Sequence, residues 1–411
     1  MVRIKDKHNC CGCESCVQTC PKHCITMQQD EEGFLYPIVH EVDCINCHLC
    51  EHVCPVINQN PQADILKVWA AQNTNDEIRK KSSSGGVASL IAENIINRGG
   101  AVFGARFNES WDVVHACAET HNQLTAFRGS KYVQSKIGNS FIHVENLLKA
   151  DRNVLFIGTP CQVAGLKCFL RREYENLITV DFICHGVPSP SIFKWYLQEE
   201  ILKYVEPDDY KNNIIGYYQM LNNDFHLPDH VKIMDIQFRN KQDGWKKYSL
   251  VLQLSISSTN GKNSEVFISN NVTKDLFLKG FTSDLYLRPS CHKCPSRNFR
   301  SGSDLTIGDF WGQEQMFPEF DNDTGVSCII VKTLKGDELI DKIKQIKKEV
   351  KTIGQALAYN PSLIISKAES YNRKKFWKYI GKYSFEDSVN RALHLNIAER
   401  AMLKIKNKFK K

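Results

Sequence analysis

Residues 10–21 read CCGCESCVQTCP, and residues 44–55 read CINCHLCEHVCP. Both stretches contain the spacing CxxCxxCxxxCP, which is the bacterial arrangement for 4Fe–4S clusters. In that arrangement the fourth cysteine of each run ligates the cluster held mainly by the other run. The spacing therefore predicts two clusters. The first site consists of Cys10, Cys13, Cys16 and Cys54, and the second site consists of Cys44, Cys47, Cys50 and Cys20.

The alternative for these cysteines is a pair of zinc sites, because CxxC is also zinc spacing. Zinc proteins pair CxxC units, whereas each run here is a triple with a distant fourth cysteine. Residues 25–27 and 34–39 are predicted strands joined by a polar turn, which is a hairpin signal. The segment 1–60 thus resembles a dicluster ferredoxin. Cys11 stands beside a ligand and could compete with it, and Cys24 is expected to be a small buried residue.

The chain has 411 residues and 17 cysteines. That length allows two to four domains, which is far more than a ferredoxin needs. The first residues contain no apolar stretch, so no secretory signal is predicted, and no run approaches the roughly 18 apolar residues of a membrane span. Many cysteines with cluster spacing and no signal indicate a reducing compartment, so we expect a cytoplasmic protein.

The net charge of +7 is unevenly distributed along the chain. Residues 1–60 contain four basic and eight acidic side chains, whereas the C-terminal end is lysine-rich. Such an end is most simply a solvated helix face, and a docking site for an acidic redox partner is the alternative. A basic tail also raises the possibility of nucleic-acid binding. The tail contains no recognisable nucleic-acid motif, so no nucleic-acid partner is expected.

Strands and helices alternate after a polar linker at residues 56–65. Residues 82–98 are predicted to form a helix that begins with serines and glycines, and residues 154–157 are predicted to form a buried strand. Gly158-Thr159-Pro160 then turns into a helix that starts near Cys161. A second buried strand, 177–183, ends at Cys184, His185 and Gly186. In proteins with this alternation, the residues that bind ligands or take part in reactions lie at the carboxyl ends of the strands.

Further along the chain, a cysteine pair precedes another predicted strand. Strands are expected at 231–238 and 248–255, without assignable chemistry. The stretch 287–312 then reads LRPSCHKCPSRNFRSGSDLTIGDFWG and contains Cys291, Cys294 and the strand 305–307. Three other cysteines lie within apolar strand or helix patterns and are expected in the core: Cys117, Cys168 and Cys328.

Six short motifs occur in this order along the chain: SSGG, SKY, GTPCQ, CHG, CHKCP and GDFWG. Each is short, but the six in order are specific enough to indicate a family. Over residues 65–345 they together resemble the family of the coenzyme F420 hydrogenase/dehydrogenase beta subunit. The expected fold is α+β (mixed α/β). A dicluster ferredoxin domain at 1–60 is followed by a mixed-sheet flavin domain, with its N-terminal part at 65–150 and its C-terminal part at 151–345. A basic helical tail at 346–411 completes the chain.

The resemblance implies that the chain binds FAD and a third cubane cluster. The implied flavin contacts are Ser84, Gly85, Gly86, Lys131, Gly158, Thr159 and Asp309. The implied ligands of the third cluster, which we call the third site, are Cys161, Cys184, Cys291 and Cys294. The residues alone leave another interpretation open, in which Cys291 and Cys294 form a redox dithiol or half of a zinc site while Cys161 is simply buried.

The expected activity is an FAD-dependent iron–sulfur oxidoreductase. It passes electrons between a redox partner such as ferredoxin and an organic acceptor, and His185 is a candidate proton donor near the flavin. A flavin is suited to this task because clusters transfer single electrons, whereas an organic acceptor usually takes two as a hydride. The alternative is a non-catalytic electron-transfer subunit of a larger redox complex.

Overall fold

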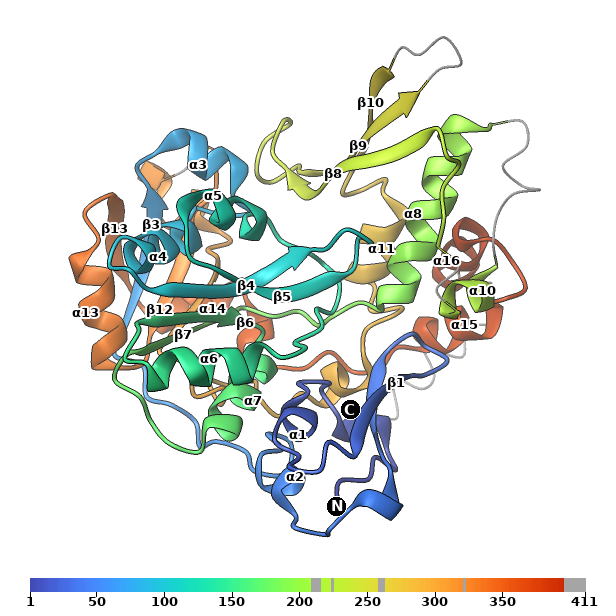
Figure 1. Ribbon diagram of the computed structural model, residues 1–411. Helices are drawn as coiled ribbons and strands as arrows, with labels where there is room; N and C mark the ends of the chain where they lie inside the picture. The colour runs from blue at the N-terminus through green and yellow to red at the C-terminus, as the bar shows by residue number, and fades with distance from the viewer. Residues whose placement is uncertain (208–215, 223–224, 258–262, 321–322, 395–411) are drawn as a thin grey trace, which may run out of the picture.

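The computed structural model describes residues 1–411 except 208–215, 223–224, 258–262, 321–322 and 395–411. The cysteine-rich segment forms a small module at one end of the molecule (Figure 1). Its hairpin pairs β1 (Ile25–Gln29) with β2 (Leu35–Val39) in antiparallel register. Its short helical elements are η1 (Lys7–Asn9), α1 (Ser15–Gln18), η2 (Glu41–Asp43) and α2 (Leu49–His52).

An eight-stranded mixed sheet forms the centre of the chain, in the order β13-β3-β12-β11-β7-β6-β4-β5. Strands β4, β6, β7 and β11 are parallel to one another, whereas β5, β12 and β13 each run antiparallel to a neighbour. The bounds are β3 (Lys67–Asn73), β4 (Ala101–Phe107), β5 (Val113–Ala118), β6 (Val154–Gly158), β7 (Leu177–Phe182), β11 (Leu305–Asp309), β12 (Ser327–Val331) and β13 (Ile346–Lys351).

Helices cover both faces of this sheet because its central strands are apolar on both sides. Along β6, Leu155 and Ile157 pack with α4 (Val87–Ile96) and α13 (Leu334–Lys342). Val154 and Phe156 point the other way, as the period of two in a strand requires, and pack with α6 (Ser140–Lys149) and α7 (Pro160–Leu170). Short elements complete this region: α3 (Asp76–Lys81), α5 (His121–Leu124), η3 (Thr125–Phe127), α12 (Gln313–Met316) and η5 (Pro318–Phe320).

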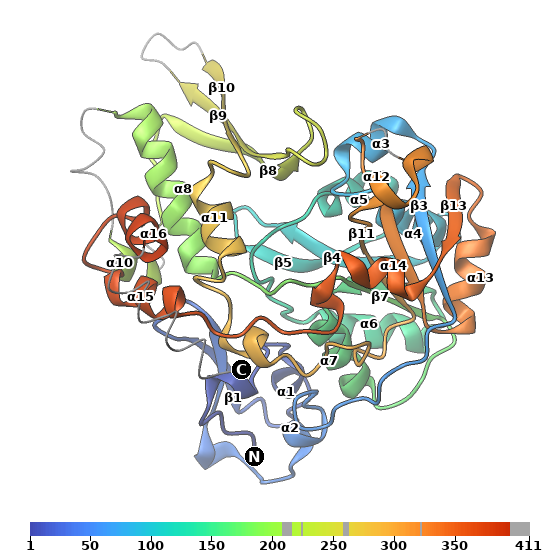
Figure 2. The same ribbon diagram turned by 180° about the vertical axis from the view of Figure 1, so that it is seen from behind.

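A second core lies beside the sheet, around a three-stranded antiparallel sheet of order β10-β9-β8. Its strands are β8 (Val231–Asn240), β9 (Ser249–Ser257) and β10 (Asn263–Asn271). Both ribbon views place the C-terminal helices next to α8 and α11 (Figure 2). The helices of this region are α8 (Pro190–Val205), α10 (Tyr217–Leu221), α11 (Leu276–Thr282), α15 (Tyr371–Tyr379) and α16 (Phe385–Leu393).

The region after residue 345 differs from the expected helical tail. It begins with β13, which pairs with β3, and continues through α14 (Ile353–Ala358) and η6 (Pro361–Leu363) before α15. Its later helices are packed rather than free, since Phe376, Phe385 and Val389 are buried. The lysine-rich end that raised the nucleic-acid question lies outside the described residues: Lys404, Lys406, Lys408, Lys410 and Lys411.

The sheet brings the sequence motifs to one edge. The parallel strands end at Gly158, Phe182 and Asp309, and β3 runs in the same direction and ends at Asn73. The helix expected from residue 82 begins only at Val87, because Gly86 is left-handed with φ of +82° and the serines before it form a bend. Every motif that follows one of these strands therefore lies at the same edge, where α/β proteins bind ligands.

Candidate functional site

The second site surrounds a cavity at the outer end of the cysteine-rich module. All four of its cysteines, Cys20, Cys44, Cys47 and Cys50, line that cavity. Cys24 lines it as well, with its Sγ 3.5 Å from that of Cys20, and it is buried as expected. The backbone N–H of Val2 donates to Cys50 Sγ at 3.3 Å, which is the kind of donor that tunes cluster sulfurs.

The first site lies deeper in the chain, against the central domain. Burial, with a smaller contribution from the nearby thiols of Cys13 and Cys10, raises the pKa of Cys54 to about 11. The pKa of Cys16 is raised by burial and then by Cys13, Cys10 and Cys54. The four thiols are thus within electrostatic reach of one another, although Cys54 is 38 or more residues from the others in the chain.

The third site brings together cysteines from three distant segments. Cys161 belongs to the first turn of α7, Cys184 follows β7, and Cys291 and Cys294 lie in and just after η4 (Pro289–Lys293). All four line one cavity. The N–H of Val187 donates to Cys291 Sγ at 3.4 Å. Burial raises the pKa of Cys291 to about 11 and that of Cys294 to about 12, so only a bound metal would make both into thiolates.

These three sets of thiols suit clusters better than single ions. Within the described ranges, no three His, Cys, Asp or Glu side chains come close enough to hold one metal ion. A cubane holds its four thiolates at its corners, farther apart than the donors around a single zinc ion. Four thiols around each of the second and third cavities are the kind of donor set that a 4Fe–4S cluster takes.

Cys11 has a place that the sequence did not reveal. It lines the third cavity together with Cys161, and interactions with Cys13 of the first site and Cys161 of the third raise the pKa of Cys11 well above its usual value. The contact with Cys11 is the main reason why the pKa of Cys161 falls to about 7, and the Thr159 hydroxyl adds to the effect. The doubled cysteine in the CC of residues 10–11 was the only signal in the sequence.

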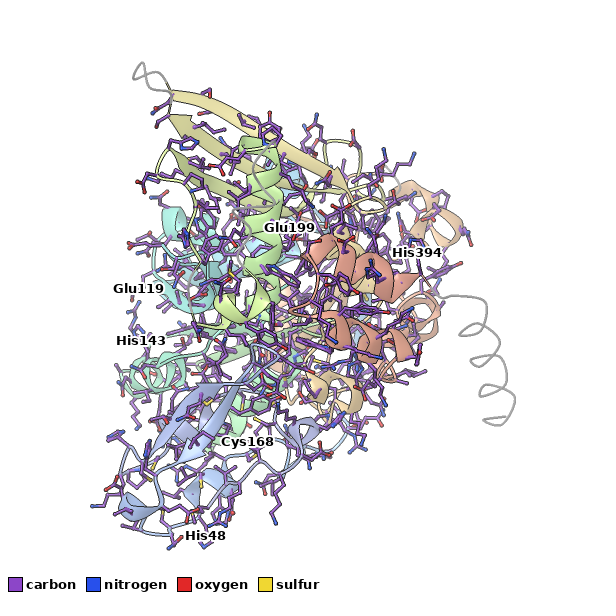
Figure 3. The ribbon with its side chains drawn as sticks, turned by 90° about the vertical axis from the view of Figure 1, so that its right-hand side faces the viewer. His48, Glu119, His143, Cys168, Glu199 and His394 are labelled. Atoms are coloured by element: carbon purple, nitrogen blue, oxygen red, sulfur yellow. The ribbon has the colours of Figure 1, made fainter. Side chains whose placement is uncertain are left out.

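Helix α7 connects the first and third sites. Cys161 lies in its first turn, and Gly165 follows four residues later. The hydroxyl of Ser15 donates to the Gly165 carbonyl at 2.9 Å, and Cys13 packs directly on Gly165. Cys168, expected in the core, is only half-buried and lies next to the linker carbonyl of Asn58, 3.7 Å away. Figure 3 shows Cys168 near this junction and His48, beside the second site, at the far end of the module.

The candidate flavin residues form two groups at the sheet edge. In the first group, Ser84 Oγ donates to the Val326 carbonyl at 2.8 Å, and Ser83 of the same loop accepts from Ser130 N at 2.6 Å. Gly85 is required there, because a Cβ would stand 2.5 Å from the Ala71 carbonyl oxygen. The second group is Gly158 and Thr159, which start α7 beside the third site through the Thr159–Gln162 capping box.

Two other candidates of the first group are already engaged. The carboxylate of Asp309 pairs with Arg239 at 2.5 Å and accepts from Trp245 Nε1 at 3.3 Å. Lys131 Nζ donates to three backbone carbonyls of its own loop, and burial lowers its pKa to about 7. Asp309 thus holds Arg239, whose buried Nε and second terminal nitrogen have no hydrogen-bond partner within the described structure.

Arg239 belongs to an aromatic and cationic cluster that sequence reasoning missed. Its guanidinium lies 4.5 Å from the centre of the Tyr248 ring and 5.5 Å from that of Trp311. Trp311 stacks on Trp245 with ring centres 4.5 Å apart and planes at 7°. A partly unpaired buried guanidinium beside stacked rings fits an anionic, planar ligand such as a flavin nucleotide. The polar strand pattern of residues 231–255 gave no such signal.

His185 lies between the third site and Asp284. Its Nε2 is 2.6 Å from Asp284 Oδ1, and its ring meets Phe281 edge-on at 5.0 Å. Arg297, which also lines the third cavity, donates to the His185 carbonyl at 2.8 Å. The fold thus fixes the orientation of this imidazole.

The fold and the two cysteine runs of the N-terminal module define an iron–sulfur protein in which a dicluster module is joined to a mixed α/β domain. Family models agree with this assignment. They match residues 9–58 as a 4Fe–4S dicluster domain, and residues 68–140 and 151–355 as the N- and C-terminal parts of the coenzyme F420 hydrogenase/dehydrogenase beta subunit. The chain belongs to the family of this beta subunit.

Individual relatives are distant. A subunit of the F(420)H(2) dehydrogenase of Methanosarcina mazei is 22% identical over 185 residues, covering 42% of this chain and 51% of that protein. The chain thus spans about half the length of this curated relative. A ferredoxin of Mycolicibacterium smegmatis is 31% identical over 91 residues, covering 22% of this chain and 74% of that protein.

One solved structure is also similar. A chain of the F420-reducing NiFe hydrogenase complex of Methanosarcina barkeri aligns with a TM-score of 0.40 and 14% identity, over 81% of this chain and 92% of its own length. Among the helices of the described residues, none has the length and apolar character needed to cross a bilayer.

Proposed function

We propose that this chain is an FAD-dependent iron–sulfur oxidoreductase that passes electrons between a ferredoxin-like donor and an organic acceptor. The family membership and the dicluster module support the iron–sulfur part of this proposal. The first, second and third sites would each hold a 4Fe–4S cluster on the cysteines named above. The proposed enzyme has three regions along the chain: the cysteine-rich module at 1–60, the flavin domain at 65–150 and 151–345, and the packed region that follows.

The observation that carries the proposal is the spatial order of the three sites. The second site lies at the outer end of the module, and the first site packs on α7 through Cys13 and Gly165. Cys161 lies one turn earlier on the same helix and lines the third cavity at the sheet edge. The thiol sets thus lead from the surface of the module to the edge where the candidate flavin residues lie.

Each cofactor would add a distinct chemistry. Clusters transfer single electrons. FAD, when bound, would take up electrons one at a time and pass them on as a pair, or the reverse. The chain itself contributes backbone N–H donors to the thiols, a buried environment and the cationic Arg239 with its aromatic neighbours. The SSGG segment before α4 would hold the negatively charged part of the nucleotide, and the Lys131 cation, whose N–H groups are bound to backbone carbonyls, would attract it by charge.

For His185 we propose a proton-donor role at the acceptor. Asp284 holds Nε2, so the ring is fixed and Nδ1 remains to carry or receive the proton. The acceptor is proposed as an organic compound with a conjugated ring, because such a ring can take a hydride from a flavin. The name of the Methanosarcina mazei relative points to a deazaflavin, which is one member of that class.

The test is an anaerobic reductive titration of the purified chain with dithionite. Three clusters and one FAD would take up about five electrons per chain, one for each cluster and two for the flavin. An uptake of about three electrons with no flavin absorption would contradict the FAD part of the proposal, and an uptake of about two would also remove the third cluster.

The second candidate function is a non-catalytic electron-transfer subunit, and the match to one component of a dehydrogenase favours it. The two functions differ in what the isolated chain can do. An enzyme oxidises a reduced ferredoxin with a free deazaflavin as acceptor, whereas a non-catalytic component turns over only after a partner protein is added. Steady-state assays with and without such a partner therefore separate the two candidates.

A further inference from the structure

Arg288 lies at the boundary between the cysteine-rich module and the central domain and is 1% exposed. Its Nε donates to the Cys10 carbonyl at 2.8 Å, and one terminal nitrogen lies 3.6 Å from Cys10 Sγ. That nitrogen also donates to the Leu35 carbonyl at 2.9 Å, and the other donates to the amide oxygen of Gln134 at 2.9 Å. One side chain from the central domain thus reaches the thiol of a first-site ligand.

The module is shaped to receive this guanidinium. The central carbon of the guanidinium, Cζ, lies 4.3 Å from the centre of the Tyr36 ring. Gly12, in the ligand loop, has φ of +70°, and a Cβ there would stand 2.8 Å from a terminal nitrogen of Arg288. Glycine therefore provides both the left-handed turn of the ligand loop and the space for the cation.

The charge of Arg288 is not neutralised by direct contact. Its hydrogen-bond acceptors are two carbonyls, one amide and one thiol, and none of the ion pairs found among the described residues includes it. A carboxylate that interacts with it at longer range, Glu14, is itself held by the N–H groups of Ile137 and Gly138. At the second site two residues with a cationic group line the cavity. One is the exposed Lys22, whose charge is screened by water, and the other is Met1, whose N-terminal ammonium is paired with Glu51 at 3.1 Å.

We propose that Arg288 is a positioning residue that raises the reduction potential of the first site above that of the second. Reduction adds a negative charge to a cluster, and a fixed buried cation within hydrogen-bonding reach of its thiolate stabilises that state. Electrons arriving at the outer end of the module are thereby drawn inward, toward α7 and the third site. This inference rests on the proposed cluster assignment and adds the direction of transfer within the module.

The test compares Arg288→Gln with the wild-type chain by an EPR-monitored anaerobic redox titration. The first-site step is the one that disappears in Cys54→Ala. We expect Arg288→Gln to lower the equilibrium constant for reduction of the first site about tenfold or more. For one electron, a tenfold change lowers the reduction potential by about 59 mV. The reduction potential of the second site should not change. Arg288→Lys, which retains the charge, should restore most of the potential although it loses the fork of hydrogen bonds.

A matched control separates charge from mechanical attachment. Arg373 also fastens the central part of the chain to the module, through an ion pair with Glu32 and a hydrogen bond to the Leu287 carbonyl. The double variant Glu32→Gln with Arg373→Gln removes that attachment without a change in net charge, and should leave the first-site potential unchanged. An equal drop in this variant, or an unshifted first-site step in Arg288→Gln with full iron content, would overturn the inference. Loss of all cluster signals in the wild-type chain would instead refute the cluster assignment.

Discussion

Gly165 packs so closely on Cys13 that a Cβ at residue 165 would lie 2.7 Å from the Cβ of Cys13 and 3.0 Å from its sulfur. This contact joins α7 of the central domain to a ligand of the first site. Since Cys161 lies four residues earlier on the same helix, one rigid element contacts two of the three thiol sets. The first and third sites are therefore coupled through a single helix.

Gly165→Ala should damage this junction. Alanine normally stabilises a helix relative to glycine by about 1 kcal/mol, but here the added methyl overlaps Cys13, and overpacking costs about 1–3 kcal/mol. We expect a lower melting temperature and a first site that loses iron on storage. Gly354→Ala in α14 is the matched control, because its Cβ would meet only Thr352 Oγ1 at 3.8 Å. Equal stability of both variants would show that the junction is not tightly packed.

Cys294→Ser should remove the third cluster and leave the other two. The expected loss is about four of the iron atoms per chain, measured by a colorimetric iron assay on anaerobically purified protein. Cys117→Ser serves as the control, since that half-buried thiol packs beside the apolar core of α6 and α7. Unchanged iron in Cys294→Ser would exclude this residue as a ligand.

Local patterns in the sequence predicted the local features of the fold. The cysteine spacing within each run, the hairpin β1–β2 and the apolar run of β6 depend on neighbouring residues, and each has its counterpart in the structure. Strand β13 was not predicted because IKKEVK is polar, and only its pairing with β3 makes it a strand.

Features that depend on distant contacts were not predictable in the same way. Nothing in the sequence distinguishes Arg288 from other arginines, and its role emerges only when the module docks beside it. Cys168 occupies an apolar helical position, but the linker at Asn58 lies over that part of α7 and leaves the thiol half-buried at the junction. Arg239, on β8, pairs with Asp309, which lies 70 residues further along the chain.

Lys131 should control flavin affinity. The three N–H groups of Lys131 Nζ are held by backbone carbonyls, so it would act on the flavin nucleotide through its charge. Lys131→Met should therefore weaken FAD binding about tenfold or more, with iron content unchanged. Lys131→Arg should retain most of the affinity. Because burial lowers the pKa of Lys131 to about 7, the cation is lost as pH rises through that value, and FAD affinity should fall above about pH 7. A pH-independent affinity measured by flavin fluorescence would argue against this contact.

His115 should make the fold sensitive to mild acid. It is buried between the Ile157 carbonyl and the Ser135 hydroxyl, and burial lowers its pKa to about 4. The unfolded chain, with a histidine pKa near 6.5, takes up a proton first, so stability is present at pH 7 and is lost as pH falls. When the pH falls from 7 to 5, this histidine should therefore lower the free energy of unfolding of the protein by about 2 kcal/mol.

The His115→Gln variant isolates that contribution. Its unfolding free energy, from urea titrations followed by tryptophan fluorescence, should depend less on pH than that of the wild-type chain by the same amount. Parallel pH profiles for the two proteins would mean that His115 is already protonated, or equally exposed, in the folded state.

The central claim is that the chain holds three cubane clusters and one flavin. The most direct test is a count of iron, acid-labile sulfide and FAD on anaerobically purified protein. We expect about twelve iron atoms, about twelve sulfides and about one FAD per chain. A count of about eight irons without flavin would contradict the claim, leaving only the dicluster module as a cofactor-binding unit.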